Sequence, residues 1–118
     1  MYQFSYAEVV EESSAACRDR ERSAIERSIE LLKIADEAGP GTREAIEALT
    51  FVQRLWGILI EDLAKPENEL PPQLRADLIS IGLWIRREAE DIRLEKSTNF
   101  KGLIEITSAI SEIGRAHV

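Results

Sequence analysis

The side chains able to carry out chemistry in this 118-residue chain are few and widely spaced. His117 is the single histidine and the second-last residue, where chains usually fray, so we expect no catalytic or metal-binding role for it. Cys17 is the single cysteine, with no histidine near it in sequence, and we predict an inert, buried thiol there. One cysteine cannot form an internal disulfide bond, which fits a reducing compartment.

Two groups of carboxylates could in principle hold a metal ion: Glu61 with Asp62, and Glu88 with Glu90 and Asp91. A carboxylate metal site in a helical bundle uses Glu-x-x-His pairs facing inward, and neither segment contains a histidine. Solvated charged surface is therefore the preferred interpretation. The chain also lacks a glycine-rich phosphate loop, a Walker-type lysine and a nucleophile elbow. We expect a protein that is not an enzyme and needs neither metal nor cofactor.

Composition and charge narrow the class of partner. With 44% hydrophobic and 31% charged residues, the chain has the composition of one soluble globular domain over residues 1–118. Its 22 acidic and 15 basic residues give a net charge of −7, which repels phosphate, so direct nucleic-acid binding is not expected as the main activity. Arg18, Arg20 and Arg22 alternate with acidic residues and form no basic patch.

No part of the sequence indicates a membrane protein. The longest apolar runs are a few residues, whereas a bilayer-spanning helix needs about 20. The first dozen residues are acidic and lack a long apolar run, so we expect neither a signal peptide nor an anchor. A cytoplasmic location is the prediction.

Clusters of glycine and proline divide the chain into segments with helical periodicity. Serine at position 13 or 14 can cap the first helix, and Gly39-Pro40-Gly41 ends it. Pro66 stops the second helix and Pro72 fits the first turn of the third. The prediction is an all-α fold, a small four-helix bundle with an N-terminal aromatic segment. The helices are placed near residues 14–38, 42–64, 72–95 and 99–113.

The second predicted helix carries two apolar rows, which together cover about half of its circumference. The rows are Ala45, Leu49, Val52, Trp56, Leu59 and Leu63, and Ala48, Phe51, Leu55 and Ile58. Such a helix should lie between two neighbours in the bundle, with Trp56 in the core.

The third predicted helix has two opposed apolar faces. The core stripe is Leu74, Leu78, Ile81, Ile85, Ala89 and Ile92. The far side carries Ala76, Ile79, Leu83 and Leu94, with Trp84 on one flank. Two apolar faces need two partners, and the second partner is either another helix of this chain or a different molecule. Ile79, Leu83 and Trp84 are therefore candidate partner-binding residues, because buried aromatic side chains often anchor interfaces.

Aromatic residues alternate at the start of the chain, at Tyr2, Phe4 and Tyr6, and would point one way in an extended segment. We predict a strap over residues 1–13 that packs on the bundle, in preference to a free recognition arm. A short helix from Tyr6 to Glu12 is the alternative, because Ser5 and Glu8 have capping-box spacing. The three aromatic residues are also candidate partner-binding residues.

Taken together, these segments resemble the FlaF family, flagellar biosynthesis regulators of alphaproteobacteria. The resemblance covers nearly the whole chain in the expected order. It rests on QFSYAEV (Gln3–Val9), RERSAIERSIELL (Arg20–Leu32), RLWGILIEDLAKPENELP (Arg54–Pro71), LRADLISIGLWIRREAEDI (Leu74–Ile92) and NFKGLIEI (Asn99–Ile106). The chain departs from the family pattern at Ser13-Ser14, where a Ser-Pro helix start is usual, and in its tail, residues 115–118.

The resemblance implies a cytoplasmic, non-enzymatic factor needed for flagellin production. Family members act after transcription, opposing regulators of the FlbT family that hold back translation of flagellin messenger RNA, and have also been viewed as flagellin-binding export chaperones. The acidic charge and the surplus apolar faces favour capture of an amphipathic flagellin helix. The first alternative is a post-transcriptional regulator acting on RNA or on a translational repressor of the FlbT type. The second is a homodimer that covers the extra face itself.

Overall fold

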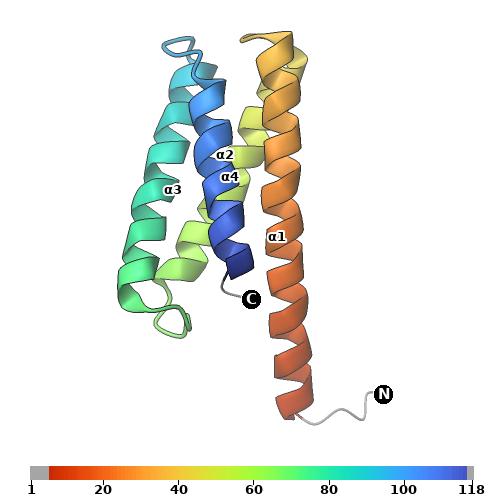
Figure 1. Ribbon diagram of the computed structural model, residues 1–118, viewed down its shortest axis with the longest axis vertical. Coiled ribbons are helices and arrows are strands. Elements are labelled where there is room, and N and C mark those ends of the chain that lie inside the picture. Colours follow the sequence, from red (N-terminus) through yellow and green to blue (C-terminus); the bar gives the residue numbers. More distant parts are fainter. Residues whose placement is uncertain (1–5, 117–118) are drawn as a thin grey trace.

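Four helices make up the described part of the chain, as shown in Figure 1. The computed structural model describes the backbone of residues 6–116 and the side chains of residues 20–113. The helices are α1 (Tyr6–Ala38), α2 (Arg43–Ala64), α3 (Pro72–Arg93) and α4 (Phe100–Ala116), and residues 6–116 contain no strand. The all-α, four-helix prediction is confirmed.

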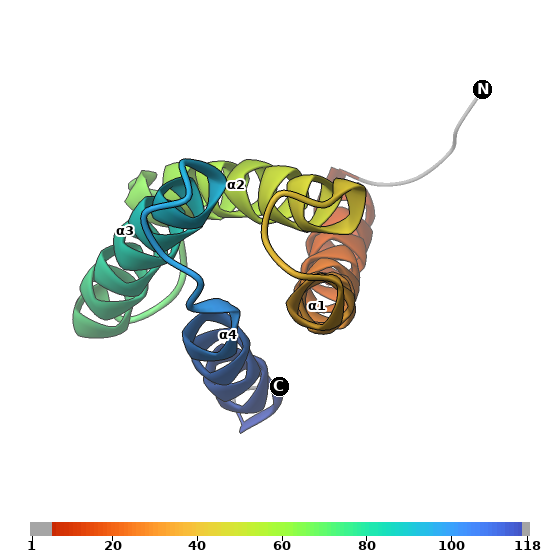
Figure 2. The same ribbon diagram turned by 90° about the horizontal axis from the view of Figure 1, so that it is seen from above.

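The helices run alternately up and down (Figures 1 and 2). Their pairs do not all pack equally closely around the core. Seen from above in Figure 2, α2 bridges α1 and α3, and α4 lies on the opposite side. Packing is extensive between α2 and α3, between α1 and α2, and between α1 and α4, but sparse between α3 and α4. The predicted position of α2 between two neighbours is confirmed.

The first helix starts earlier than predicted. It begins at Tyr6 rather than near residue 14, so the predicted boundary was wrong. The alternative of a short helix from Tyr6 to Glu12 has the correct start, but the helix continues without a break to Ala38. The physical reason is that residues 6–14 contain neither glycine nor proline, and acidic residues such as Glu8 suit the first turns of a helix. The N-terminal part of α1 extends past the ends of the other helices (Figure 1). The strap predicted for Tyr2 and Phe4 falls outside the described residues.

The other helix ends follow local chemistry. The hydroxyl of Thr42 accepts a hydrogen bond from the Ala45 amide at 3.2 Å, which caps α2. Helix α3 ends at Arg93 rather than at the predicted residue 95, because Glu95 adopts the left-handed conformation with φ of 60°. The side chain of Asn99 caps α4 by accepting a hydrogen bond from the Gly102 amide at 3.0 Å.

The core forms where α2 crosses its neighbours. Trp56 is 2% exposed, so its predicted core role is confirmed. Gly82 of α3 faces its ring so closely that an added Cβ would lie 2.5 Å from Trp56 Cε3. Leu32 of α1 and Phe100 and Leu103 of α4 complete this buried cluster. One residue of the predicted second row of α2, Ile58, is 66% exposed and therefore not in the core.

Candidate partner-binding surface

The core stripe of α3 is buried at one end only. Its last members, Ile85, Ala89 and Ile92, are at most 1% exposed. Its first members, Leu74, Leu78 and Ile81, are only half-buried. The difference arises because α4 diverges from α3 below the connection between them, as Figures 1 and 2 both show. Among the side chains of residues 20–113, those at the beginning of the stripe are therefore only partly covered.

Helix α4 contributes the opposite side of this uncovered region. Leu103 and Ile110 are buried, whereas Ile106 is half-buried and Ile113 is 38% exposed. At about 100° per residue, these positions fall within one sector of α4, a helix that packs extensively on α1 and only sparsely on α3. Apolar side chains therefore line both helices where they diverge.

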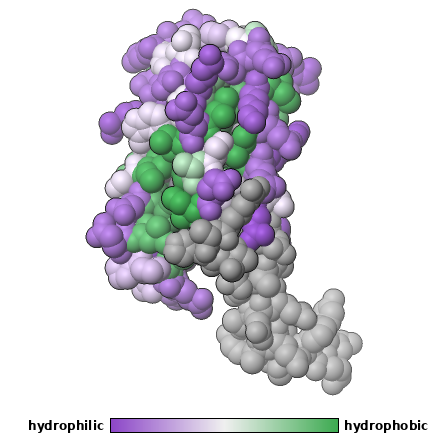
Figure 3. Space-filling model, in the orientation of Figure 1, coloured by the Kyte–Doolittle hydropathy of each residue, from purple (hydrophilic) through white to green (hydrophobic). Residues whose placement is uncertain are grey.

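We call this region the α3/α4 face. It is defined by residues of α3 and α4 that remain partly exposed: Leu74, Leu78, Ile81, Trp84, Ile106 and Ile113. Figure 3 shows apolar side chains gathered on the side of the molecule where α3 and α4 lie. Trp84 is 39% exposed and lies about 60° around the helix from Ile81, which places it at the rim of this face. Two diverging helices with partly exposed apolar side chains are suited to bind the apolar face of a further helix.

The structure separates the three predicted binding residues of α3. Leu83 is 53% exposed and lines a groove between α2 and α3, on the other side of α3 from the α3/α4 face. Ile79 is half-buried on that same side of the helix, and Trp84 points away from both. The three residues therefore do not form one surface. Their role in partner binding stays a prediction, as does that of Tyr2, Phe4 and Tyr6, whose side chains are outside the described part.

Sequence reasoning placed Leu74, Leu78 and Ile81 in the core and missed their exposure. A signal was available, because the predicted fourth helix, 99–113, is shorter than the third, 72–95, and cannot cover its whole length. The splay between α3 and α4 reduces this cover further. The spacing of apolar residues shows which side of a helix faces inward, and the neighbouring helix decides how far that side is buried.

The carboxylates of the chain do not converge on a centre. Glu61 and Asp62 are exposed, Glu88 accepts a hydrogen bond from Ser97, and Glu90 pairs with Arg93. Among the described residues, no group of three or more His, Cys, Asp or Glu side chains is arranged to hold a metal ion. Cys17 and His117 have side chains outside the described part. The described helices also include none with the length and apolar character needed to span a bilayer.

The partly buried carboxyl group of Glu21 has a raised pKa. Partial burial of Glu21 on α1 raises the pKa of its carboxyl group, and the negative charge of Asp62 on α2 raises it further. This pair lies at the contact between α1 and α2, away from the α3/α4 face. It therefore bears on stability rather than on that surface.

Comparison with known proteins supplies the remaining observation. A family model described as flagellar protein FlaF matches residues 2–112, nearly the whole chain, which confirms the resemblance. No curated protein and no solved structure matches the chain.

Proposed function

The chain belongs to the FlaF family of flagellar proteins, and from this premise we propose that it regulates flagellin synthesis and flagellum assembly by binding flagellin. In this proposal it acts without enzymatic activity, in the cytoplasm, as a chaperone that keeps flagellin unpolymerised and couples it to export. Whether the protein is free or bound to flagellin would then influence translation of flagellin.

The α3/α4 face is the observation that carries this proposal. Its half-buried side chains, including Leu78, Ile81 and Ile106, already contact the core but lack a neighbour on their outer side. An amphipathic helix laid along the face would bury them with anchors at helical spacing. The family resemblance supplies the identity of that helix, because flagellin has terminal helices that must be shielded before export.

The affinity depends on how many anchors the flagellin helix buries. Complete burial of a large apolar side chain contributes about 1.5–3 kcal/mol, and half-buried residues contribute less. Micromolar affinity requires about 8 kcal/mol after the costs of association and ordering, so contacts along the whole face must contribute.

The direct test is binding of purified flagellin to the protein with Trp84→Asp. A charge at this rim position cannot be buried against an apolar helix without a large desolvation cost. We expect the affinity, measured by isothermal titration calorimetry, to fall about tenfold or more.

A matched control keeps this test interpretable. Ile58→Asp places the same charge at a more exposed apolar position on α2, outside the α3/α4 face. Far-ultraviolet circular dichroism should show unchanged helix content for both variants. Wild-type protein that fails to bind flagellin, or equal losses in the two variants, would overturn the proposal.

The alternative function is control of flagellin translation through direct contact with RNA or with a repressor of the FlbT type. The net charge of −7 weighs against direct RNA binding. A pull-down from flagellated cells, with and without nuclease, distinguishes the two. Flagellin that is retained after nuclease treatment supports the chaperone proposal, whereas nuclease-sensitive RNA supports the alternative.

A further inference from the structure

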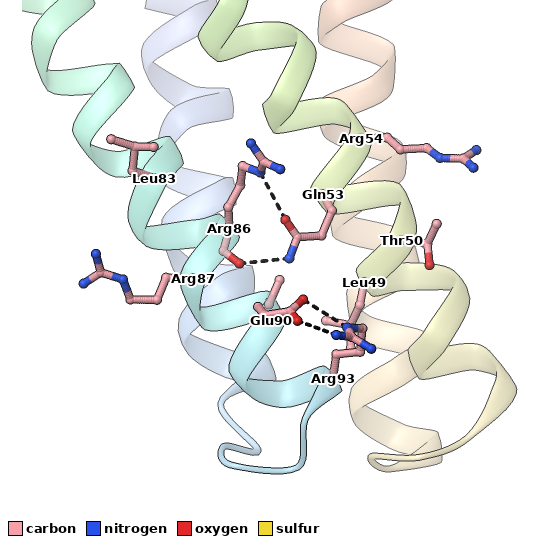
Figure 4. Close-up of a pocket in the computed structure, with 10 residues that line it drawn as sticks. Leu49, Thr50, Gln53, Arg54, Leu83, Arg86, Arg87, Glu90 and Arg93 are labelled. Carbon is pink, nitrogen blue, oxygen red and sulfur yellow. Dashed lines mark hydrogen bonds and ion pairs between the residues drawn. The ribbon is translucent and has the colours of Figure 1, made fainter.

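A second surface lies on the opposite side of α3. The groove between α2 and α3 has a volume of about 530 Å³. Figure 4 views it with α4 and α1 behind, which places it away from the α3/α4 face. Leu83 of α3 is its exposed apolar side chain, at 53% exposed, whereas Leu49 of α2 lines it as a core residue only 3% exposed.

The groove is rich in arginine. Its ten lining residues include four arginines and one carboxylate. The arginines are Arg54, Arg86, Arg87 and Arg93, and the carboxylate is that of Glu90. This concentration of positive charge occurs in a chain whose net charge is −7. A local field of opposite sign to that of the whole protein selects for an acidic ligand.

One arginine is held in place across the groove. The Arg86 Nε donates a hydrogen bond to Gln53 Oε1 at 3.1 Å, and Gln53 Nε2 donates to the Arg86 carbonyl oxygen at 2.9 Å. This reciprocal pair joins α2 to α3 and orders the Arg86 side chain before any ligand arrives (Figure 4). Ordering in advance lowers the entropy lost on binding.

The other arginines differ in their partners. Arg93 pairs with Glu90, so its charge is largely compensated. Within residues 20–113, no hydrogen bond or ion pair engages the side chain of Arg54 or of Arg87. Figure 4 shows Arg54 on the α2 rim and Arg87 on the α3 rim, both extending outward. Two uncompensated guanidinium groups thus flank a groove in which Leu83 is the exposed leucine.

We propose that the α2/α3 groove binds an acidic amphipathic helix of a partner protein. An apolar side chain of that helix would contact exposed Leu83, and its carboxylates would accept hydrogen bonds from Arg54 and Arg87 at the rims. Because the groove lies on the other side of α3, this inference does not rest on flagellin binding at the α3/α4 face.

The apolar part of the groove favours a protein over RNA. A phosphate backbone is recognised by many cationic groups and makes no use of leucine side chains. Here the uncompensated cations are few, and exposed Leu83 lies beside them. The acidic surface elsewhere on the chain also repels a long polyanion.

The test measures binding of fluorescein-labelled synthetic helical peptides by fluorescence anisotropy. The acidic peptide carries leucine and glutamate on one face, and a matched peptide carries glutamine in place of every glutamate. We expect the acidic peptide to bind about tenfold tighter, with an affinity that falls as salt is added. Arg54→Glu with Arg87→Glu should abolish this preference.

The control variant applies the same change of charge outside the groove. Lys33→Glu with Lys101→Glu alters exposed positions on α1 and α4, and screening by salt should leave peptide affinity within about twofold of wild type. Circular dichroism checks that both variants stay helical, and flagellin binding should be unchanged in both.

Four results would overturn the inference. The first two are equal affinity for the acidic and neutral peptides, and equal losses in the groove and control variants. The third is a single-stranded RNA oligonucleotide that binds tighter than the acidic peptide and is released by the groove substitutions, which would make the groove a nucleic-acid site. The fourth is self-association that depends on the groove arginines and excludes the peptide, which would make it a homodimer interface.

Discussion

The two sides of α3 present different chemistry on one helix. Toward α4, half-buried Leu78 and Ile81 continue the stripe that is buried further along at Ile85. Toward α2, exposed Leu83 lies among arginines, with Arg86 tied to Gln53. On the side toward α4, apolar side chains are only partly buried. On the side toward α2, the two helices pack together and arginine side chains line the edge of their contact. The two sides of α3 therefore differ in the kind of partner that we propose for each.

The largest effect on stability is expected at the fully buried end of the α3 core stripe. Ile85→Ala should lower the free energy of unfolding by about 2–5 kcal/mol, because it removes a fully buried side chain. Leu78→Ala, at the open end of the same stripe, should cost about half as much, because less apolar area is lost. Urea denaturation of both variants measures the difference. Equal losses would mean that the open end is covered as fully as the closed end.

A smaller effect is expected at the contact that sets the distance between α2 and α3. In Gly82→Ala the new Cβ would lie 2.5 Å from Trp56 Cε3 and 3.1 Å from Ile60 Cδ1, so the helices must shift, at a cost of about 1–3 kcal/mol. Because α3 carries both surfaces, binding of flagellin and of the acidic peptide should weaken together.

Gly57→Ala is the matched control for that substitution. A Cβ at Gly57 would meet Arg86 Nη1 at 4.0 Å, an ordinary contact, and alanine is the better helix former by about 0.8–1 kcal/mol. Thermal denaturation should therefore show stabilisation at position 57 and destabilisation at position 82. The same sign at both positions would contradict the close packing of α2 on α3.

The smallest effect is expected outside both surfaces, at Glu21. Because its folded-state pKa is raised, protonated Glu21 favours folding at low pH, and this contribution is lost as the pH rises through that pKa. Glu21→Gln should thus stabilise the protein at pH 7 by less than about 1 kcal/mol, since the side chain is only partly buried and solvent screens its charge.

Thermal unfolding and binding measurements test the prediction for Glu21→Gln. Thermal unfolding at pH 7 and at a pH below the ordinary glutamate pKa should show the gain at pH 7 only. Binding of flagellin and of the acidic peptide should be unchanged, which separates stability from both surfaces of α3. An equal gain at both pH values would assign the effect to something other than ionisation.

Much of the fold could be predicted from particular residues. Gly39-Pro40-Gly41 and Pro72 mark helix ends that the structure reproduces, because backbone conformation at glycine and proline depends on local sterics. The core position of Trp56 followed from apolar spacing. The end of α3, at Arg93, lies two residues before the position predicted from the sequence, and the left-handed Glu95 that follows it carries no glycine signal.

The candidate surfaces were less predictable. Ile79, Leu83 and Trp84 were grouped because they lie off the core stripe, yet Leu83 lines the α2/α3 groove and Trp84, about 100° around the helix from it, does not. The arginine groove was missed because Arg54 and Arg86 are distant in sequence, and only the packing of α2 on α3 brings them together. A search of the sequence for runs of basic residues finds no such groove.

By itself, the sequence determined the number of helices, which side of each faces inward, the absence of a recognisable catalytic motif and the family. These properties depend on local conformation, helical periodicity and residue type, which the chain carries at short range. Only the tertiary structure decided where burial stops along α3 and which charges meet across α2 and α3. Both depend on the angle and spacing between helices, and those are set by side-chain packing between residues far apart in the chain.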